Sequence, residues 1–331
     1  MRSARFRNRS AELPSAAAAA SHDRDRARGQ QRVNMKPAPE RIGFIGIGLI
    51  GRPMVMRLLQ AGQSVTIWGR RPERLQDVLE AGASWADSAA EVARASDVIV
   101  LCVADTPAVE QVLAGDEGLA AGLGDGQLVI DMGTTDVTVT RRLAATILQQ
   151  TGAGWLDAPI SGGPAGALAG TLAVMAGGEP ADFERARPVV DCFSSRFTLM
   201  GPVGAGQTAK MINQVIVGGC KAVIAEAIQL ASNLGIDPLR LPEAFDGGRA
   251  DSTLLRQSVA KMAGRDYSAT GGHLRTIMKD LNQVMELGRS TGTPMPMTAL
   301  ATELHRIMVA HGHGELDSTS TIALLRNQPI V

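Results

Sequence analysis

The 331-residue sequence predicts an α/β fold: a Rossmann-type, doubly wound sheet followed by an all-helical second domain. Two observations support this prediction. From Arg41 onward, short apolar runs of strand length alternate with stretches of helical length, the pattern of parallel strands joined by crossover helices. After Met200 the strand-like runs stop and helical patterns continue. We therefore expect a disordered extension over residues 1–40, the α/β domain over 41–200 and the helical domain over 201–331.

The first 40 residues differ from the rest in composition. They are rich in Arg, Ala and Ser, contain five consecutive alanines at 16–20, and show no sustained apolar period. Such a segment cannot bury enough apolar surface to fold, so we expect it to be disordered. The alternative is a transit peptide, although Glu12, Asp23 and Asp25 count against one. Met35 precedes the first strand signal directly and is an alternative start of the chain.

Apolar runs with turn residues at their ends define the individual elements. Strands are expected at 42–45, 65–68, 97–103, 127–131, 154–157 and 172–175, with the sheet mainly parallel at its start. Helices are expected between them at 51–61, 72–80, 106–113 and 137–149. The second domain should contain helices at 208–234, 238–245, 276–290, 296–311 and 319–325. The first of these is apolar on most faces, so it must be buried in a core or against a second subunit. We therefore expect a homodimer or homotetramer.

Composition excludes several classes of protein. The formal net charge is zero, which gives no support to a nucleic-acid partner. Cys102, Cys192 and Cys220 are far apart and form no CxxC pair, so buried thiols in a reducing cytoplasm are favoured over disulfides, and no metal site is expected. Gly and charged residues interrupt every apolar run before it reaches the ~20 residues of a membrane span, so no membrane is expected.

A glycine-rich motif follows the first predicted strand. Residues 41–54 read RIGFIGIGLIGRPM and open a predicted helix, which is the context that a GxGxxG motif requires. Glycines there permit a tight turn and close approach of a pyrophosphate to free N–H groups of the helix. The cofactor-binding candidates are Gly46, Ile47, Gly48, Leu49, Ile50 and Gly51.

The end of the second predicted strand bears on which dinucleotide binds. An NAD site has Asp or Glu there to hold the ribose hydroxyls, whereas this chain has Gly69 followed by Arg70 and Arg71. Guanidinium groups bind a 2′-phosphate that a carboxylate would repel. The sequence therefore favours NADP, with NAD as the alternative if the two arginines are merely a solvated charge pair.

Three further segments carry a resemblance to a known family. They are 157–178 (DAPISGGPAGALAGTLAVMAGG), 201–214 (GPVGAGQTAKMINQ) and 274–283 (LRTIMKDLNQ). Together with the glycine motif they resemble the β-hydroxyacid dehydrogenases, which include 3-hydroxyisobutyrate dehydrogenases and tartronate semialdehyde (2-hydroxy-3-oxopropionate) reductases. The similarity extends from about residue 41 to 325. It implies a Rossmann domain, a helical domain and an active site between them.

The resemblance also implies roles for residues in the first two segments. In the first, Ser161, Gly162 and Gly163 would bind the carboxylate of a small substrate. In the second, Lys210 would be the catalytic acid–base, since a Lys beside an apolar wall titrates at lower pH than one in water. Asn213 would be catalytic as well, because it lies three residues on and shares one helix face with Lys210. Gln214 would contact the substrate, and the Asn-Gln pair is similar to that of the tartronate semialdehyde reductases.

Two more cofactor contacts follow from the resemblance. Lys279 in the KDL motif would reach the nicotinamide side, with Asp280 orienting it, and Thr134 after a strand end would lie near the same ring. The expected activity is interconversion of a small β-hydroxy acid and its semialdehyde, with 2-hydroxy-3-oxopropionate preferred. The alternatives are 3-hydroxyisobutyrate or another hydroxy acid, and a non-catalytic dinucleotide-binding protein on the same fold.

Overall fold

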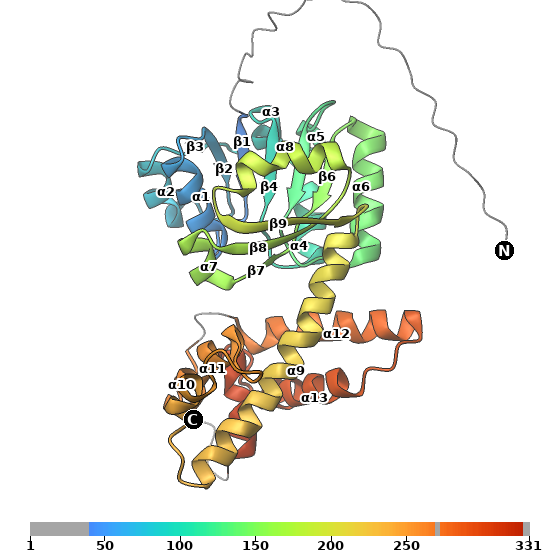
Figure 1. Cartoon of the computed structure of the whole chain (residues 1–331). Helices are drawn as coiled ribbons and strands as arrows, with labels where there is room; N and C mark the ends of the chain where they lie inside the picture. Colours follow the sequence, from blue (N-terminus) through green and yellow to red (C-terminus); the bar gives the residue numbers. More distant parts are fainter. Residues whose placement is uncertain (1–39, 269–271, 327–331) are drawn as a thin grey trace, which may run out of the picture. The chain divides into compact units, whose positions relative to one another are not determined.

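The computed structural model describes residues 40–268 and 272–326. The predicted extension up to residue 39 lies outside this range. Residues 40–201 contain one nine-stranded sheet, ordered β3-β2-β1-β4-β5-β6-β8-β7, with β9 beside β8 (Figure 1). The strands are β1 (Ile42–Ile45), β2 (Val65–Trp68), β3 (Ser84–Trp85), β4 (Val98–Leu101), β5 (Leu128–Asp131), β6 (Gly154–Asp157), β7 (Ile160–Ser161), β8 (Leu172–Gly177) and β9 (Ser194–Gly201). Strands β1 to β6 pair in parallel, and β8 is antiparallel to β6 and β7.

Helices cover both faces of this sheet. They are α1 (Gly51–Gln60), α2 (Gln76–Glu80), α3 (Ala89–Arg94), α4 (Thr106–Leu113), α5 (Leu119–Gly122), α6 (Val137–Thr151), α7 (Gly163–Ala169) and α8 (Pro180–Val190), with a 3-10 turn η1 (Pro72–Arg74). All residues of β1, β4 and β5 are buried, as expected for parallel strands enclosed on both sides. Phe44 packs in the core that α1 and α8 share, and Ile45 packs in the core of α3 and α6.

In the second part of the chain the described residues form helices joined by loops, with one isolated β-bridge between His273 and Asp317 and no strand. The helices are α9 (Ala205–Asn233), α10 (Leu241–Phe245), α11 (Thr253–Gly264), α12 (Leu274–Thr291) and α13 (Pro296–Ala310), with 3-10 segments η2 (Pro238–Arg240) and η3 (Ser318–Leu325). The long helix α9 begins against β8 and β9 and continues into contact with α11, α12, α13 and η3. It is therefore shared between the sheet domain and the helical domain.

Helix α9 corrects the expectation that every apolar run is interrupted before it reaches the length of a membrane span. It has the length and hydropathy of a helix that could cross a membrane, because a few Lys and Gly residues do not lower its mean hydropathy enough. It contacts strands of the first domain and helices of the second, and 28% of its most apolar 18-residue window is buried within the chain.

The predicted fold class is confirmed, whereas several element predictions were incomplete. Segments 72–80 and 238–245 each divide into a 3-10 turn and a short α-helix, and the predicted helix at 319–325 is a 3-10 segment. The apolar pattern predicts none of the elements β3, β7, β9, α3, α5, α7, α8 and α11. The expectation that all three cysteines are buried was also wrong, since Cys220 on α9 is exposed; all three are free thiols.

Candidate active site

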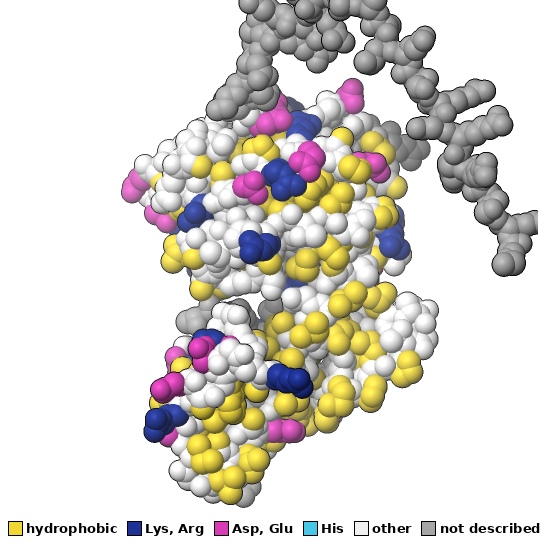
Figure 2. Space-filling view, in the orientation of Figure 1, with side chains coloured by type: hydrophobic (Ala, Val, Ile, Leu, Met, Phe, Trp, Pro, Cys, Tyr) yellow, Lys and Arg dark blue, Asp and Glu magenta, His cyan; other side chains and the backbone are white. Residues whose placement is uncertain are grey.

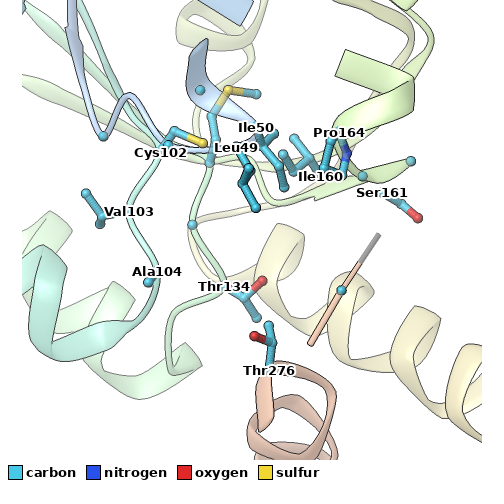
Figure 3. Close-up of a pocket in the computed structure, with 18 of the residues that line it drawn as sticks. Leu49, Ile50, Cys102, Val103, Ala104, Thr134, Ile160, Ser161, Pro164 and Thr276 are labelled. Atoms are coloured by element: carbon cyan, nitrogen blue, oxygen red, sulfur yellow. The ribbon is translucent and has the colours of Figure 1, made fainter. Parts of the chain in front are cut away.

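A cavity of about 1150 Å³ lies where the carboxyl ends of the central strands face the helical domain. Figure 3 shows Leu49, Ile50 and Ser161 from the sheet domain around the same space as Thr276 of α12. The volume exceeds that of most pockets for one small ligand, so a dinucleotide and a substrate can share it. The predicted residues that line it are Gly46, Ile47, Gly48, Leu49, Ile50, Gly51, Arg70, Arg71, Thr134, Ser161, Gly162, Gly163, Lys210, Gln214 and Lys279.

The glycine-rich loop between β1 and α1 has the geometry that a pyrophosphate requires. Gly46 has a φ of 100°, and a Cβ there would lie 2.2 Å from the carbonyl oxygen of Cys102. A Cβ at Gly48 would instead meet nothing within 4 Å. In the first turn of α1 the N–H of Arg52 donates to the carbonyl oxygen of Gly48 and Pro53 has no N–H, so the N–H of Gly51 is the one that remains for an anion there. The loop therefore fits a dinucleotide, with the free space over Gly48.

Three arginines border the cavity just beyond β2. Arg70 and Arg71 were predicted there, and Arg74 of the 3-10 turn η1 joins them. Within the described residues, none of the three has a carboxylate at ion-pair distance. Sequence reasoning missed Arg74 because it assigned residues 72–80 to one continuous helix. Unpaired guanidinium groups at this edge suit a phosphate on the adenosine ribose.

The predicted substrate loop joins β7 to α7. Gly162 and Gly163 have φ values of 126° and 61°, a region that L-residues with a side chain rarely adopt. This conformation turns the chain from Ser161 directly into the first turn of α7, where backbone N–H groups lack helical partners. The loop can therefore present N–H donors and one hydroxyl to a carboxylate in the cavity.

Lys210 lies in the second turn of α9 and is only 8% exposed. Its Nζ donates a hydrogen bond to the carbonyl oxygen of Ile160, at 2.9 Å, next to the Ser161 loop. Burial lowers the pKa of Lys210 from its ordinary value, and the neighbouring Lys279 lowers it further, while Asp280 acts in the opposite direction. Such an amine can exchange a proton with a ligand in the cavity at a lower pH than a surface lysine.

Asp280 connects the polar groups of the two facing helices. It is 3% exposed, and its Oδ2 accepts a hydrogen bond of 2.6 Å from Nε2 of Gln214 on α9. Its Oδ1 lies 3.4 Å from Nζ of Lys279. Lys279 also donates to the carbonyl oxygens of Ala104 and Thr134, at 3.2 and 3.1 Å. The α12 helix is thereby tied to the loops that follow β4 and β5.

Asn213 is placed differently from the other predicted residues. It does not line the cavity, and its Nδ2 donates to Oε1 of Gln214 at 2.9 Å. In the described part of the chain no hydrogen bond joins Asn213 to Lys210. Gln214, four residues after Lys210, lies closer to the same helix face. The geometry thus brings Lys210, Gln214, Asp280 and Lys279 together and leaves Asn213 in contact with the site through Gln214.

Two buried carboxylates lie at the strand ends beside this site. Asp131 and Asp157 are register partners at the carboxyl ends of β5 and β6. Asp157 accepts hydrogen bonds from the backbone N–H groups of Gly204 and Gln207, both at 2.7 Å. Burial raises the pKa of Asp131 to about 7, with the charge of Asp157 adding to the effect, and burial raises the pKa of Asp157 to about 6. Asp157 therefore positions the start of α9, whereas Asp131 accepts hydrogen bonds from the N–H of Gly133 and the hydroxyl of Thr135 in the loop after β5. The described residues offer no cluster of three or more metal ligands.

Comparison with known proteins agrees with this geometry. Residues 41–201 match the family described as the NAD binding domain of 6-phosphogluconate dehydrogenase. Residues 204–325 match the family described as "NAD-binding of NADP-dependent 3-hydroxyisobutyrate dehydrogenase". The 2-hydroxy-3-oxopropionate reductase of Escherichia coli is 35% identical over 285 residues, which cover 86% of this chain and 97% of the relative.

Two solved structures resemble the chain closely. The structure of 3-hydroxyisobutyrate dehydrogenase from Salmonella typhimurium has a TM-score of 0.78 at 28% identity, covering 86% of this chain and 99% of that one. A structure of Psf3 in complex with NADP+ and 2-OPP has a TM-score of 0.79 at 27% identity. The match covers 86% of this chain and 100% of that one. With both halves matched and the cavity built as described, the chain belongs to the β-hydroxyacid dehydrogenase family of NAD(P)-binding oxidoreductases.

Proposed function

We propose that this chain is an NADP-dependent oxidoreductase that interconverts a small β-hydroxy acid and its semialdehyde, with 2-hydroxy-3-oxopropionate as the preferred candidate. The observation that carries the proposal is the position of Lys210. Its buried Nζ lies beside the Ser161 loop, in the same cavity as the glycine-rich loop. A proton donor, a carboxylate site and a dinucleotide site thus open into one space.

NADP(H), when bound, supplies or accepts the hydride in this chemistry. Lys210 as the ammonium form donates a proton to the oxygen of the aldehyde as it becomes an alkoxide. In the oxidation direction neutral Lys210 removes the hydroxyl proton. The Ser161 loop holds the substrate carboxylate, which fixes the orientation of the reacting carbon and so raises its effective concentration. Gln214, held by Asp280, contacts the substrate, and Asn213 supports Gln214.

Support for NADP comes from Arg70, Arg71 and Arg74, which face the cavity without carboxylate partners in the described residues. The similar Psf3 structure contains NADP+. Support for the substrate comes from the 35% identical reductase and from the Asn213-Gln214 pair. Lys279, bonded to the carbonyl of Thr134, is assigned to the nicotinamide side of the site.

The test is NADPH oxidation across a panel of C3–C5 semialdehydes, followed by Lys210→Met with the best substrate. General acid–base groups contribute ~10²–10⁴-fold, so turnover should fall by that order while NADPH binding, measured by fluorescence titration, changes little. Lys279→Met should weaken both turnover and NADPH binding, since Lys279 spans the loops at Ala104 and Thr134. Near-normal turnover by Lys210→Met would show that another group moves the proton.

A further inference from the structure

Lysine is rare in this chain and is concentrated at one place. The sequence contains five lysines against 28 arginines. Four of the five lie in the described residues: Lys210, Lys221, Lys261 and Lys279. All four line the cavity. Arginine therefore supplies the basic side chains elsewhere in the described residues, and lysine occurs where a compact ammonium group faces an enclosed space.

Lys210 and Lys279 belong to the site already described, whereas Lys221 and Lys261 lie beyond it. Lys221 follows Lys210 by eleven residues on α9, close to three full turns, so the two share one face of the helix. The intervening residues on that face, Gln214 and Val217, also line the cavity. The cavity thus continues along α9 for about 16 Å from the backbone of Lys210 to that of Lys221. A three-carbon acid held at Lys210 cannot extend that far.

The far end of the cavity is polar and carries an excess of positive charge. Lys261 of α11 pairs with Asp317 at 2.7 Å, so these two charges balance. Lys221 donates to the hydroxyl of Ser318, and within the described residues it has no carboxylate at ion-pair distance. Burial lowers the pKa of Lys221, and the nearby Lys261 lowers it further, while Asp317 raises it. Lys221 therefore lacks the counter-charge that would best stabilise its ammonium form.

Apart from the paired charges of Lys261 and Asp317, the groups next to Lys221 are neutral donors or a neutral ring. Ser258 and Gln257 of α11, together with Thr319 of η3, line the cavity there. His305 of α13 is buried, and because burial lowers its pKa it adds no positive charge near neutral pH. Hydroxyl and amide groups around a single uncompensated ammonium are suited to binding a carboxylate.

We propose that Lys221, supported by Lys261, binds a second carboxylate of the substrate, so that the enzyme acts preferentially on hydroxy diacids or their semialdehydes. This inference rests on the proposed function and extends it from the three-carbon acid to a longer, dianionic substrate. In this arrangement the first carboxylate binds at the Ser161 loop and the reacting carbon lies at Lys210. The second carboxylate reaches along α9 and supplies the counter-charge of Lys221.

The experiment compares diacids with monoacids of matched length. The pairs are 2-(hydroxymethyl)glutarate with 2-(hydroxymethyl)pentanoate, and 2-(hydroxymethyl)pimelate with 2-(hydroxymethyl)heptanoate, in which a terminal carboxylate replaces a methyl group. Oxidation with NADP+ should show a kcat/KM at least about tenfold higher for the diacid of the better pair, the size of one charge-assisted hydrogen bond. Lys221→Met should reduce that diacid-to-monoacid ratio toward one. Arg240→Met, which removes an exposed charge of the same domain, should leave the ratio unchanged.

Binding to the protein–NADP+ complex, measured by calorimetry, separates this inference from the proposed function. If no acid is oxidised but the diacids still bind more tightly, and Lys221→Met abolishes the difference, the proposed activity is wrong and the second carboxylate site stands. Equal binding and equal kcat/KM within each pair would overturn the inference. So would a diacid preference that Lys221→Met leaves intact.

Discussion

Arg70, Arg71 and Arg74 lie where an NAD site has a carboxylate, and this difference has a measurable consequence. Changing Arg70 and Arg71 together to Ala should raise the Kd of NADPH by about tenfold or more, because charge-assisted bonds to the 2′-phosphate are lost. The Kd of NADH should change by less than about twofold, since NADH has no such phosphate. Fluorescence titration of both cofactors measures this. An equal rise in Kd for NADPH and NADH would place these arginines away from the 2′-phosphate.

Asp131 should make the stability of the protein depend on pH. Its pKa is about 7 in the folded state against an ordinary value of 3.8, so the folded state binds one more proton than the unfolded state between these pH values. The stability that this proton provides is fully present below about pH 4 and is lost as pH rises through 7. The loss is at most about 1.4 kcal/mol per pH unit.

The variant Asp131→Asn keeps the shape of the neutral acid and removes its titration. Between pH 4.5 and pH 7.5 its free energy of unfolding should fall less than that of the native protein, as measured by urea denaturation. Asp125→Asn serves as the control, because it removes a carboxylate that is exposed. A parallel pH dependence of Asp131→Asn and the native protein would mean that Asp131 is ionised throughout this range.

Sequence reasoning at the residue scale succeeded where a motif is contiguous. The glycine-rich loop, the Ser161 loop, Lys210 and Lys279 each lie in one short segment, and the structure brings all of them to one cavity. Lys221 and Lys261 were missed because α9, α11 and η3 meet only in the folded chain. The scarcity of lysine was the signal that could have identified them.

Helix α9 depends on close backbone contact at its first turn. A Cβ on Gly206 would lie 2.4 Å from the carbonyl oxygens of Asp157 and Met175, whereas a Cβ on Gly219 in the same helix would meet nothing within 4 Å. Gly206→Ala should therefore lower the free energy of unfolding by about 2 kcal/mol or more, because backbone must move. Gly219→Ala should raise it by ~0.5–1 kcal/mol. Urea denaturation of the two variants measures both free energies of unfolding. An equal change in the two variants would show that α9 can shift freely at β6.

Elements with strong apolar periods were predicted well, and short or glycine-rich ones were not. Strands β1, β2 and β6 have the predicted bounds, since each is a compact run bounded by turn residues. Strands β3 and β7 contain two residues each, too few for any period to show. Helix α7 reads GPAGALA, a composition typical of a loop. Its helical form depends on packing against α1 rather than on propensity.

Exposed apolar side chains on the helical domain predict self-association. Ile212, Ile216, Val223 and Leu230 of α9 are 54–61% exposed and recur at helical spacing along one side. Figure 2 shows hydrophobic side chains along this part of the surface. Met297 and Leu300 of α13 are exposed as well. A homodimer or homotetramer would cover these groups.

Light scattering at micromolar concentration should therefore report at least a dimer. Ile216→Glu should shift the protein toward the monomer, because a charge would be buried in the interface. Leu148→Glu on α6 changes a side chain of similar exposure, 60% against 61%, outside α9 and should leave the mass unchanged. A monomeric native protein would contradict this prediction.

The position of the four described lysines around the cavity also governs how this part of the chain reacts with amine-directed reagents. Acylating or reductively alkylating compounds meet arginine guanidinium groups over most of the described surface, and these do not react under the same conditions. All four lysines of residues 40–268 and 272–326 line the cavity. Peptide mapping of 40–268 and 272–326 after such labelling would thus report occupancy of the site itself. Bound dinucleotide should protect Lys279, and a bound acid should protect Lys210, so each ligand would leave its own pattern of unmodified amines.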